Sequence, residues 1–268
     1  MNIKIFQICY SEETLAKLPE GFFALDNIEN LRPDWREYWP IRNFLMDNHL
    51  SDDILYGFLS PKFGEKTLLD YASINKFIEL NYNNEDVVCF SPFWDLISIF
   101  KNIFEQGDFF HPGLAVACQD FCNKHVAGLD VINSVTHSEN TIFCNYFLAK
   151  KSFWREWLEL GEKLFHCAEN SSNNLAIKLN SVTTYGASEL PMKIFVQERM
   201  ATMTLLSNSN LTCLSHSPFS TGSSTTIFNK FHTESVLSDS LKMSFMKTKN
   251  PIYFNQFSII RDRIISMI

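Results

Sequence analysis

The sequence of 268 residues lacks the short motifs that identify many common enzyme classes. It has no Gly-x-x-x-x-Gly-Lys loop, no Gly-x-Gly-x-x-Gly after a strand, no Gly-x-Ser-x-Gly elbow and no His-Glu-x-x-His pair. These absences disfavour ATPases, Rossmann dehydrogenases, α/β-hydrolases and zinc proteases. A methyltransferase is disfavoured as well, because no glycine-rich turn follows the first predicted strand.

Basic stripes, long apolar runs and paired cysteines are also missing from the sequence. The formal net charge is −7 and the Lys and Arg residues are scattered, so no nucleic-acid partner is expected. No apolar run reaches membrane-spanning length, and the N-terminal residues lack an apolar core and a cleavage site, which predicts a cytoplasmic protein. The seven cysteines are an odd number and mostly lie in apolar runs, as reduced core residues do.

Aromatic residues are abundant. They make up 14% of the chain and include 25 phenylalanines, and hydrophobic residues reach 46%, which is typical of a folded globular protein. We expect most rings to fill the core, although exposed rings could also stack on a sugar or a base. The length favours one domain over 1–211, followed by a Ser/Thr-rich connection and a helical appendage over 212–268.

The periodicity of apolar residues alternates between the strand and helix types, which predicts an α/β fold. The segments with a strand pattern are 3–10, 54–59, 86–90 and 141–149. The segments with a helical pattern are 34–45, 67–80, 94–104, 153–168, 192–206 and 254–268.

Polar side chains collect near the ends of the predicted strands, where α/β proteins bind ligands. Arg and Lys can neutralise a diphosphate, Asp and Ser can bind sugar hydroxyls, and an aromatic face can stack on a base. The sequence therefore suits a nucleotide sugar, with these candidate binding residues: Tyr10, Asp26, Arg36, Ser60, Lys62 and Ser91.

A family resemblance points the same way. The segment 140–154, which reads Asn-Thr-Ile-Phe-Cys-Asn-Tyr-Phe-Leu-Ala-Lys-Lys-Ser-Phe-Trp, and the later Gln-Glu-Arg-Met at 197–200 resemble the second half of bacterial capsule and O-antigen (lipopolysaccharide) glycosyltransferases. The resemblance covers roughly 1–206. It implies a GT-A-like fold, with a mixed, mostly parallel central sheet flanked by helices. It also implies transfer of a hexose from a nucleoside diphosphate sugar to a glycan or lipid-linked glycan acceptor. Among these donors, the resemblance favours a UDP-sugar.

The sequence departs from this family in one respect. Metal-using GT-A enzymes carry Asp-x-Asp after the central strand, where two carboxylates hold a divalent cation. Here that strand is followed by Ser-Pro-Phe-Trp-Asp, ending at Asp95. Two options remain open: Mn²⁺ or Mg²⁺ bound partly by Asp95, or no metal, with Arg36 and Lys62 neutralising the diphosphate. A non-catalytic sugar-binding or assembly protein of a polysaccharide operon is the alternative function.

Two carboxylates and two neutral side chains complete the candidate site. Asp95 or Glu198 could be the catalytic base, but Asp95 could instead cap the helix 96–104 and Glu198 could pair with Arg199. His111, in a loop before Pro-Gly, and Asn145 are candidates for acceptor or sugar binding. Asn145 is a candidate because a polar side chain in the middle of a predicted strand needs a partner. His111 could instead be only a loop residue.

The last predicted helix has an apolar stripe formed by Phe257, Ile260, Ile264 and Ile268 beside basic residues. This stripe could pack against the domain or contact a membrane surface peripherally, in which case the protein would work at the inner face of the cell membrane.

Overall fold

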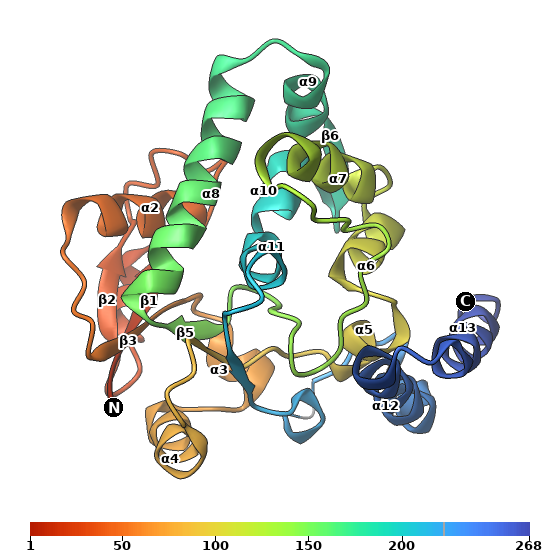
Figure 1. Cartoon of the computed structure of the whole chain (residues 1–268). Coiled ribbons are helices and arrows are strands. Elements are labelled where there is room, and N and C mark those ends of the chain that lie inside the picture. Colours follow the sequence, from red (N-terminus) through yellow and green to blue (C-terminus); the bar gives the residue numbers. More distant parts are fainter. Residues whose placement is uncertain (222) are drawn as a thin grey trace.

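The computed structural model describes residues 1–221 and 223–268 and is an α/β structure. Figure 1 shows β1, β2, β3 and β5 in the left half of the molecule, whereas β6 lies near α7 and α9. The strands are β1 (Asn2–Cys9), β2 (Phe23–Asp26), β3 (Ile54–Leu59), β4 (Val87–Cys89), β5 (Phe147–Ala149), β6 (Val182–Tyr185), β7 (Ser188–Pro191) and β8 (Cys213–Ser215).

Six of these strands form the central sheet in the order β2-β1-β3-β5-β4-β8. β1 is parallel to β2 and to β3, and β4 is parallel to β8. β5 is antiparallel to both of its neighbours, β3 and β4. The predicted mixed, mostly parallel central sheet flanked by helices is therefore confirmed.

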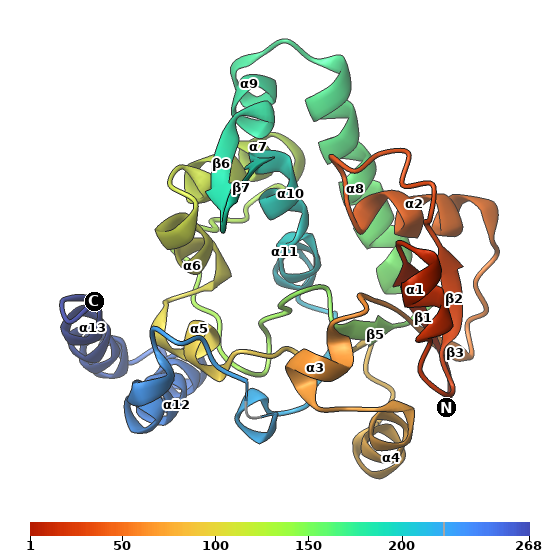
Figure 2. The same cartoon turned by 180° about the vertical axis from the view of Figure 1, so that it is seen from behind.

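Helices cover both faces of this sheet, as Figures 1 and 2 show. The α-helices are α1 (Glu12–Ala16), α2 (Tyr38–Asp47), α3 (Phe63–Thr67), α4 (Tyr71–Asn81), α5 (Trp94–Ile99), α6 (Ile103–Phe110), α7 (Leu114–His125), α8 (Lys151–Asn170), α9 (Asn174–Asn180), α10 (Met192–Gln197), α11 (Met200–Ser207), α12 (His232–Thr248) and α13 (Pro251–Ile265). Short 3₁₀ turns lie at Pro218–Ser220 and Asn229–Phe231.

The side chains of β3 show why both faces need a cover. Alternate residues of a strand point to opposite faces. Phe58 joins the large core cluster under α2, α8 and α11, whereas Leu55 and Leu59 join a second cluster under α3 and α4. Both faces of the sheet are thus apolar, as expected for a sheet with helices on each side.

Most of the tryptophans belong to the core, as predicted. Trp35, Trp154 and Trp157 are at most 1% exposed. The indole N–H of Trp154 donates to the backbone carbonyl of Tyr56 at 2.9 Å, so its polar atom is satisfied inside the core.

Several element boundaries differ from the prediction. The strand expected at 141–149 is only β5, because the backbone at Cys144 and Asn145 adopts positive φ angles. The helix expected at 192–206 is two helices, α10 and α11, with Glu198 and Arg199 between them. The helix expected at 94–104 ends at Ile99, and α6 then begins after Asn102, whose side chain accepts from two backbone N–H groups.

The last helices pack against α5 through a third apolar cluster, which includes Phe228, Phe231 and Ile264. Figures 1 and 2 show α12 and α13 side by side at the end of the molecule opposite β1. Lys242 on α12 is buried and donates to the carbonyl oxygens of Ile97 at 2.6 Å and Phe100 at 2.8 Å. These contacts fix the C-terminal helices to α5.

Two features of the segment 212–268 bear on its expected role. It contributes β8, which pairs with β4 in the central sheet, in addition to α12 and α13. Of the apolar stripe on the last helix, Phe257 and Ile264 are buried within the protein, whereas Ile268 is 51% exposed. No helix within the described part of the chain is both long and apolar enough to cross a membrane.

Candidate functional site

A cavity of about 560 Å³ opens at the carboxyl ends of β1 and β3. From β1 the chain moves outward to β2 and then returns to β3 on the other side of β1. Strand order therefore reverses at this point, and open α/β sheets bind ligands in the crevice at such a switch point. The volume is in the range of small-molecule sites in proteins.

The residues that follow the two strands form the floor of the cavity. Tyr10 comes directly after β1, and Ser60 and Lys62 come directly after β3. The hydroxyl groups of Ser60 and Tyr146 lie 2.7 Å apart and are hydrogen-bonded. Burial, followed by the charge of nearby Glu37, raises the pKa of Tyr10, so its hydroxyl stays protonated and can donate to a ligand.

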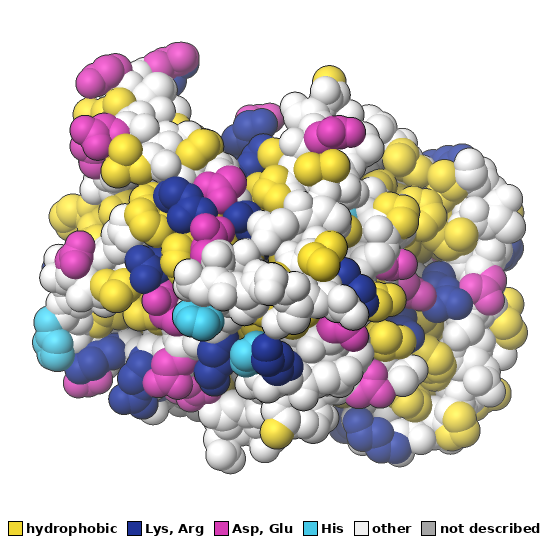
Figure 3. Space-filling model, turned by 90° about the horizontal axis from the view of Figure 1, so that it is seen from above, with side chains coloured by type: hydrophobic (Ala, Val, Ile, Leu, Met, Phe, Trp, Pro, Cys, Tyr) yellow, Lys and Arg dark blue, Asp and Glu magenta, His cyan; other side chains and the backbone are white. Residues whose placement is uncertain are grey.

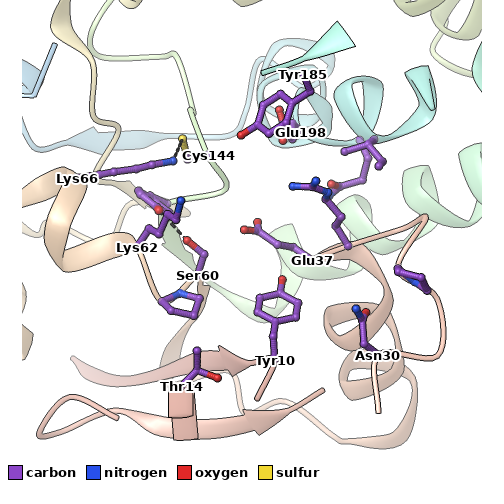
Figure 4. A pocket seen from close by; sticks show the side chains of 16 residues that line it. Tyr10, Thr14, Asn30, Glu37, Ser60, Lys62, Lys66, Cys144, Tyr185 and Glu198 are labelled. Carbon is purple, nitrogen blue, oxygen red and sulfur yellow. Dashed lines mark hydrogen bonds between the residues drawn. The ribbon is translucent and has the colours of Figure 1, made fainter. Parts of the chain in front are cut away.

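Three basic side chains line the cavity: Arg36, Lys62 and Lys66. In Figure 4, Lys62 and Lys66 enter from the side of the cavity opposite to Glu37. None of the three forms a salt bridge with any residue that the structure describes. Among the described residues, the Lys66 ammonium group donates a hydrogen bond only to the thiol of Cys144, at 3.6 Å. These cations are thus available for an anionic ligand.

Glu37 is one of two acidic side chains that line the cavity, and in Figure 4 it lies across from Lys62 and Lys66. Burial and then the charge of Glu198 raise the pKa of Glu37 from 4.5 to about 7, against a hydrogen bond from the Asn145 amide at 3.4 Å. A carboxyl group with a pKa near 7 can accept or release a proton at physiological pH.

Glu198 lies on the cavity wall next to Tyr185, and Figure 4 shows both above Glu37. Its carboxylate pairs with Arg199 at 3.0 Å, and its side chain is 39% exposed. Both interpretations of Glu198 therefore have a structural counterpart: it faces the cavity, and it pairs with Arg199.

Of the ten candidate residues, the structure brings five to the cavity wall and a sixth next to it. The five lining residues are Tyr10, Arg36, Ser60, Lys62 and Glu198. The sixth is Asn145, which is buried and donates to Glu37. These residues come from segments almost 190 positions apart in the sequence.

The other four candidates lie outside the cavity lining. Asp26 ends β2, where its carboxylate accepts from the backbone N–H of Ile28 at 2.9 Å. Ser91 is fully buried and holds the loop after β4 by donating to the carbonyl of Thr141 at 2.8 Å and accepting from the N–H of Phe143 at 2.7 Å.

Asp95 is fully buried in the first turn of α5, so it is not the N-cap residue, which is Phe93. Its carboxylate accepts from the backbone N–H of Thr225 at 2.7 Å and from the hydroxyl of the same residue. Burial raises the pKa of Asp95. This carboxylate therefore holds the segment before α12 and does not reach the cavity.

His111 stacks on Phe195 with ring centroids 3.7 Å apart, behind the cavity wall. Burial and then the charge of Arg199 lower the pKa of His111 to about 4, so the imidazole is neutral at pH 7. His111 thus packs within the protein behind the cavity wall and is not one of the lining residues.

The described residues contain no group of three or more His, Cys, Asp or Glu side chains placed to hold a metal ion. Asp95, the candidate ligand, is bonded to Thr225, and Glu198 is paired with Arg199. The donor set does not fit a preformed divalent cation site.

Among the lining residues that the sequence did not single out as candidates are Glu37, Lys66 and Tyr185. Glu37 follows Arg36 within a run of aromatic residues. A charged residue in such a run is the sequence feature that could have marked Glu37 as a candidate. Lys66 and Tyr185 gave no comparable signal, because they reach the cavity only through the position of α3 and of the β6–β7 hairpin.

Comparisons with protein-family models, with curated proteins and with solved structures find no match. Outside the cavity, the Lys and Arg side chains on the face seen in Figure 3 are interspersed with Asp and Glu side chains, and charges of one sign form no stripe there.

Proposed function

We propose that the protein is a glycosyltransferase that binds a nucleoside diphosphate sugar in this cavity. The observation that carries the proposal is the combination of three basic side chains without acidic partners among the described residues and one carboxyl group with a pKa near 7. Lys62, Lys66 and Arg36 match the charge of a diphosphate, and Glu37 matches the proton that an acceptor hydroxyl must lose.

The position of the cavity supports a GT-A-like identity. The sheet is mixed and mostly parallel, and the cavity lies where such sheets bind nucleotides. The two segments that carry the resemblance also meet here: Cys144 and Tyr146 come from the first, and Gln197 and Glu198 from the second. On the same resemblance, we propose a UDP-hexose as donor and a surface-polysaccharide intermediate as acceptor, with the reaction in the cytoplasm.

The chemical step assigns a role to each group. The acceptor hydroxyl oxygen forms a bond to the anomeric carbon of the sugar, and the bond from that carbon to the diphosphate oxygen breaks. The carboxylate of Glu37 takes the hydroxyl proton. The leaving diphosphate keeps the electron pair, and the ammonium groups of Lys62 and Lys66 with the guanidinium of Arg36 stabilise its charge.

Binding and turnover test this proposal separately. We expect UDP and UDP-hexoses to bind by calorimetry, with and without Mn²⁺, and Lys62→Met and Lys66→Met each to weaken UDP binding about tenfold or more, because each removes a charge-assisted contact. Lys76→Met is the matched control, since Lys76 is exposed on α4 and away from the cavity. Absence of binding to every nucleotide sugar, or binding that is unchanged in both cavity variants, contradicts the proposal.

Turnover decides between an enzyme and a binding protein. Release of UDP from a UDP-hexose in the presence of an acceptor, abolished by Glu37→Gln, supports transfer. Binding without turnover that survives both Glu37→Gln and Glu198→Gln points instead to a non-catalytic sugar-binding protein of the same cavity.

A further inference from the structure

The β6–β7 hairpin stands apart from the central sheet and forms a two-stranded sheet of its own. Its strands are mostly exposed, and Gly186 at the turn has a φ of 58°. Figure 2 shows the hairpin beside α10, on the side of the molecule that faces the reader. Isolated two-stranded hairpins have little stability of their own, so this element depends on what it contacts.

Tyr185, the last residue of β6, places its ring on the cavity wall. It is 48% exposed, although its ring lies 5.8 Å from that of Phe195 and 6.4 Å from that of His111. Figure 4 shows the Tyr185 ring above the cavity, across from Tyr10. A half-exposed aromatic ring at a cavity mouth leaves a surface on which a planar ligand group can stack.

Arg36 joins this ring to the basic side of the cavity. Its guanidinium carbon lies 5.3 Å from the Tyr185 ring centroid. A guanidinium group that stacks by its face keeps its N–H donors in the plane, where they remain free for phosphate oxygens. Within the described residues, Arg36 has no acidic partner that would occupy those donors. An anion site and an aromatic surface are thus adjacent.

We infer that Tyr185 is the stacking surface for the nucleobase of the ligand and that the β6–β7 hairpin covers that base. The inference rests on the proposed function, since it assigns the planar part of a nucleoside diphosphate to one side of Arg36 and the phosphates to the other. Every base has a flat face, so stacking on Tyr185 supplies affinity for the base, and the hairpin shields it from water.

Two ligands separate this role from phosphate binding. UDP carries a base and a diphosphate, whereas inorganic pyrophosphate carries only the phosphates. We expect Tyr185→Ala to weaken UDP binding about tenfold, the typical loss for one stacked base, and to change pyrophosphate binding less than about twofold. Tyr185→Phe keeps the ring and is expected to bind UDP within about twofold of the wild-type protein.

Calorimetry with four variants makes the test complete. Tyr253→Ala is the control, because Tyr253 is a partly exposed tyrosine on α13, outside the cavity lining. Tyr185→Leu keeps an apolar side chain and replaces Tyr185→Ala if the latter fails to fold. Equal loss of UDP and pyrophosphate binding, or no loss of either, overturns the role of Tyr185. A wild-type protein that binds neither ligand contradicts the proposed function itself.

Discussion

Replacing Glu37 by Gln tests the chemistry of the cavity and its cost to the fold in one variant. The change removes the charge but keeps the shape and the oxygen that accepts from Asn145. Raising the pKa of Glu37 from 4.5 to about 7 corresponds to about 3 kcal/mol against the charged form, at about 1.36 kcal/mol for each pKa unit. We expect Glu37→Gln to recover this free energy where Glu37 is charged.

The direction with pH follows from proton linkage. The folded protein holds the Glu37 proton more tightly than the unfolded chain does. The contribution of Glu37 to the free energy of unfolding therefore falls as the pH rises from 4.5 to about 7, and it is constant at higher pH. Glu37→Gln should be more stable than the wild-type protein by about 3 kcal/mol at pH 8 and by less than about 1 kcal/mol at pH 5.

Thermal unfolding followed by circular dichroism measures this difference. The gain at pH 8 corresponds to a rise in Tm on the order of 5–10 °C for a chain of this size. Glu20→Gln is the matched control, since Glu20 is exposed and forms no ion pair in the described structure. A gain that is equal at pH 5 and pH 8, or that Glu20→Gln reproduces, refutes the assignment of a raised pKa to Glu37.

The same variant bears on catalysis. If Glu37 is the base, kcat/KM of the wild-type protein rises with pH through about 7 and then levels off. Glu37→Gln should lower kcat by about 10²–10⁴ and remove this limb of the profile, while UDP still binds. A pH profile that keeps its limb in the variant assigns the base to another group.

Two further predictions concern the sheet that carries the cavity. Gly57→Ala places a methyl group 2.8 Å from Leu148 in the adjacent strand. This variant should lower the free energy of unfolding, measured by urea titration, by about 1–3 kcal/mol. Gly64→Ala is the control: its methyl group meets nothing closer than 3.7 Å, so the variant should not destabilise the protein. Phe58→Ala removes a fully buried ring and should lower the free energy of unfolding by about 3–5 kcal/mol in the same titration. Phe23 is half-exposed, so Phe23→Ala should lower it by about 1 kcal/mol or less. Similar values for the two variants would refute the packing described for β3.

The sequence was sufficient to predict the sheet where the strand pattern was regular. The strands at 3–10, 54–59 and 86–90 correspond to β1, β3 and β4, because β-branched and aromatic residues there are buried on one or both faces. β2 was missed, because its sequence Phe-Ala-Leu-Asp is short and mostly exposed at the sheet edge. β8 was missed within a Ser/Thr-rich segment, where only its contact with β4 defines it.

The candidate site was predictable in part for a related reason. Residues that directly follow a strand, such as Tyr10, Ser60 and Lys62, could be placed near the sheet edge from the sequence. Asp95 and Ser91 follow β4 in the same way, but their side chains turn inward to hold the loops at 225 and 141–143. Whether a polar residue at a strand end faces a ligand or supports a loop depends on contacts distant in sequence.

The largest local failure of prediction coincides with the cavity wall. In a regular strand over 141–149, Asn145 would point away from the face that holds Cys144 and Tyr146. Instead Cys144 and Asn145 adopt φ angles of 59° and 54°, and Arg36 adopts 43° on the facing segment. Such conformations cost about 1–2 kcal/mol each for residues with a side chain. They let Asn145 donate to Glu37 while Cys144 and Tyr146 line the cavity.

Strain of this kind persists only where the surrounding contacts maintain it. Ser91 and Thr202 supply such contacts, since each bonds to the backbone of 141–143. Ser91 was predicted as a ligand residue, and in the structure it supports the wall that brings Asn145 to Glu37. The departure from the strand pattern thus gives Glu37 a hydrogen-bond donor, Asn145, which favours the charged carboxylate, whereas burial and the charge of Glu198 raise the pKa of Glu37.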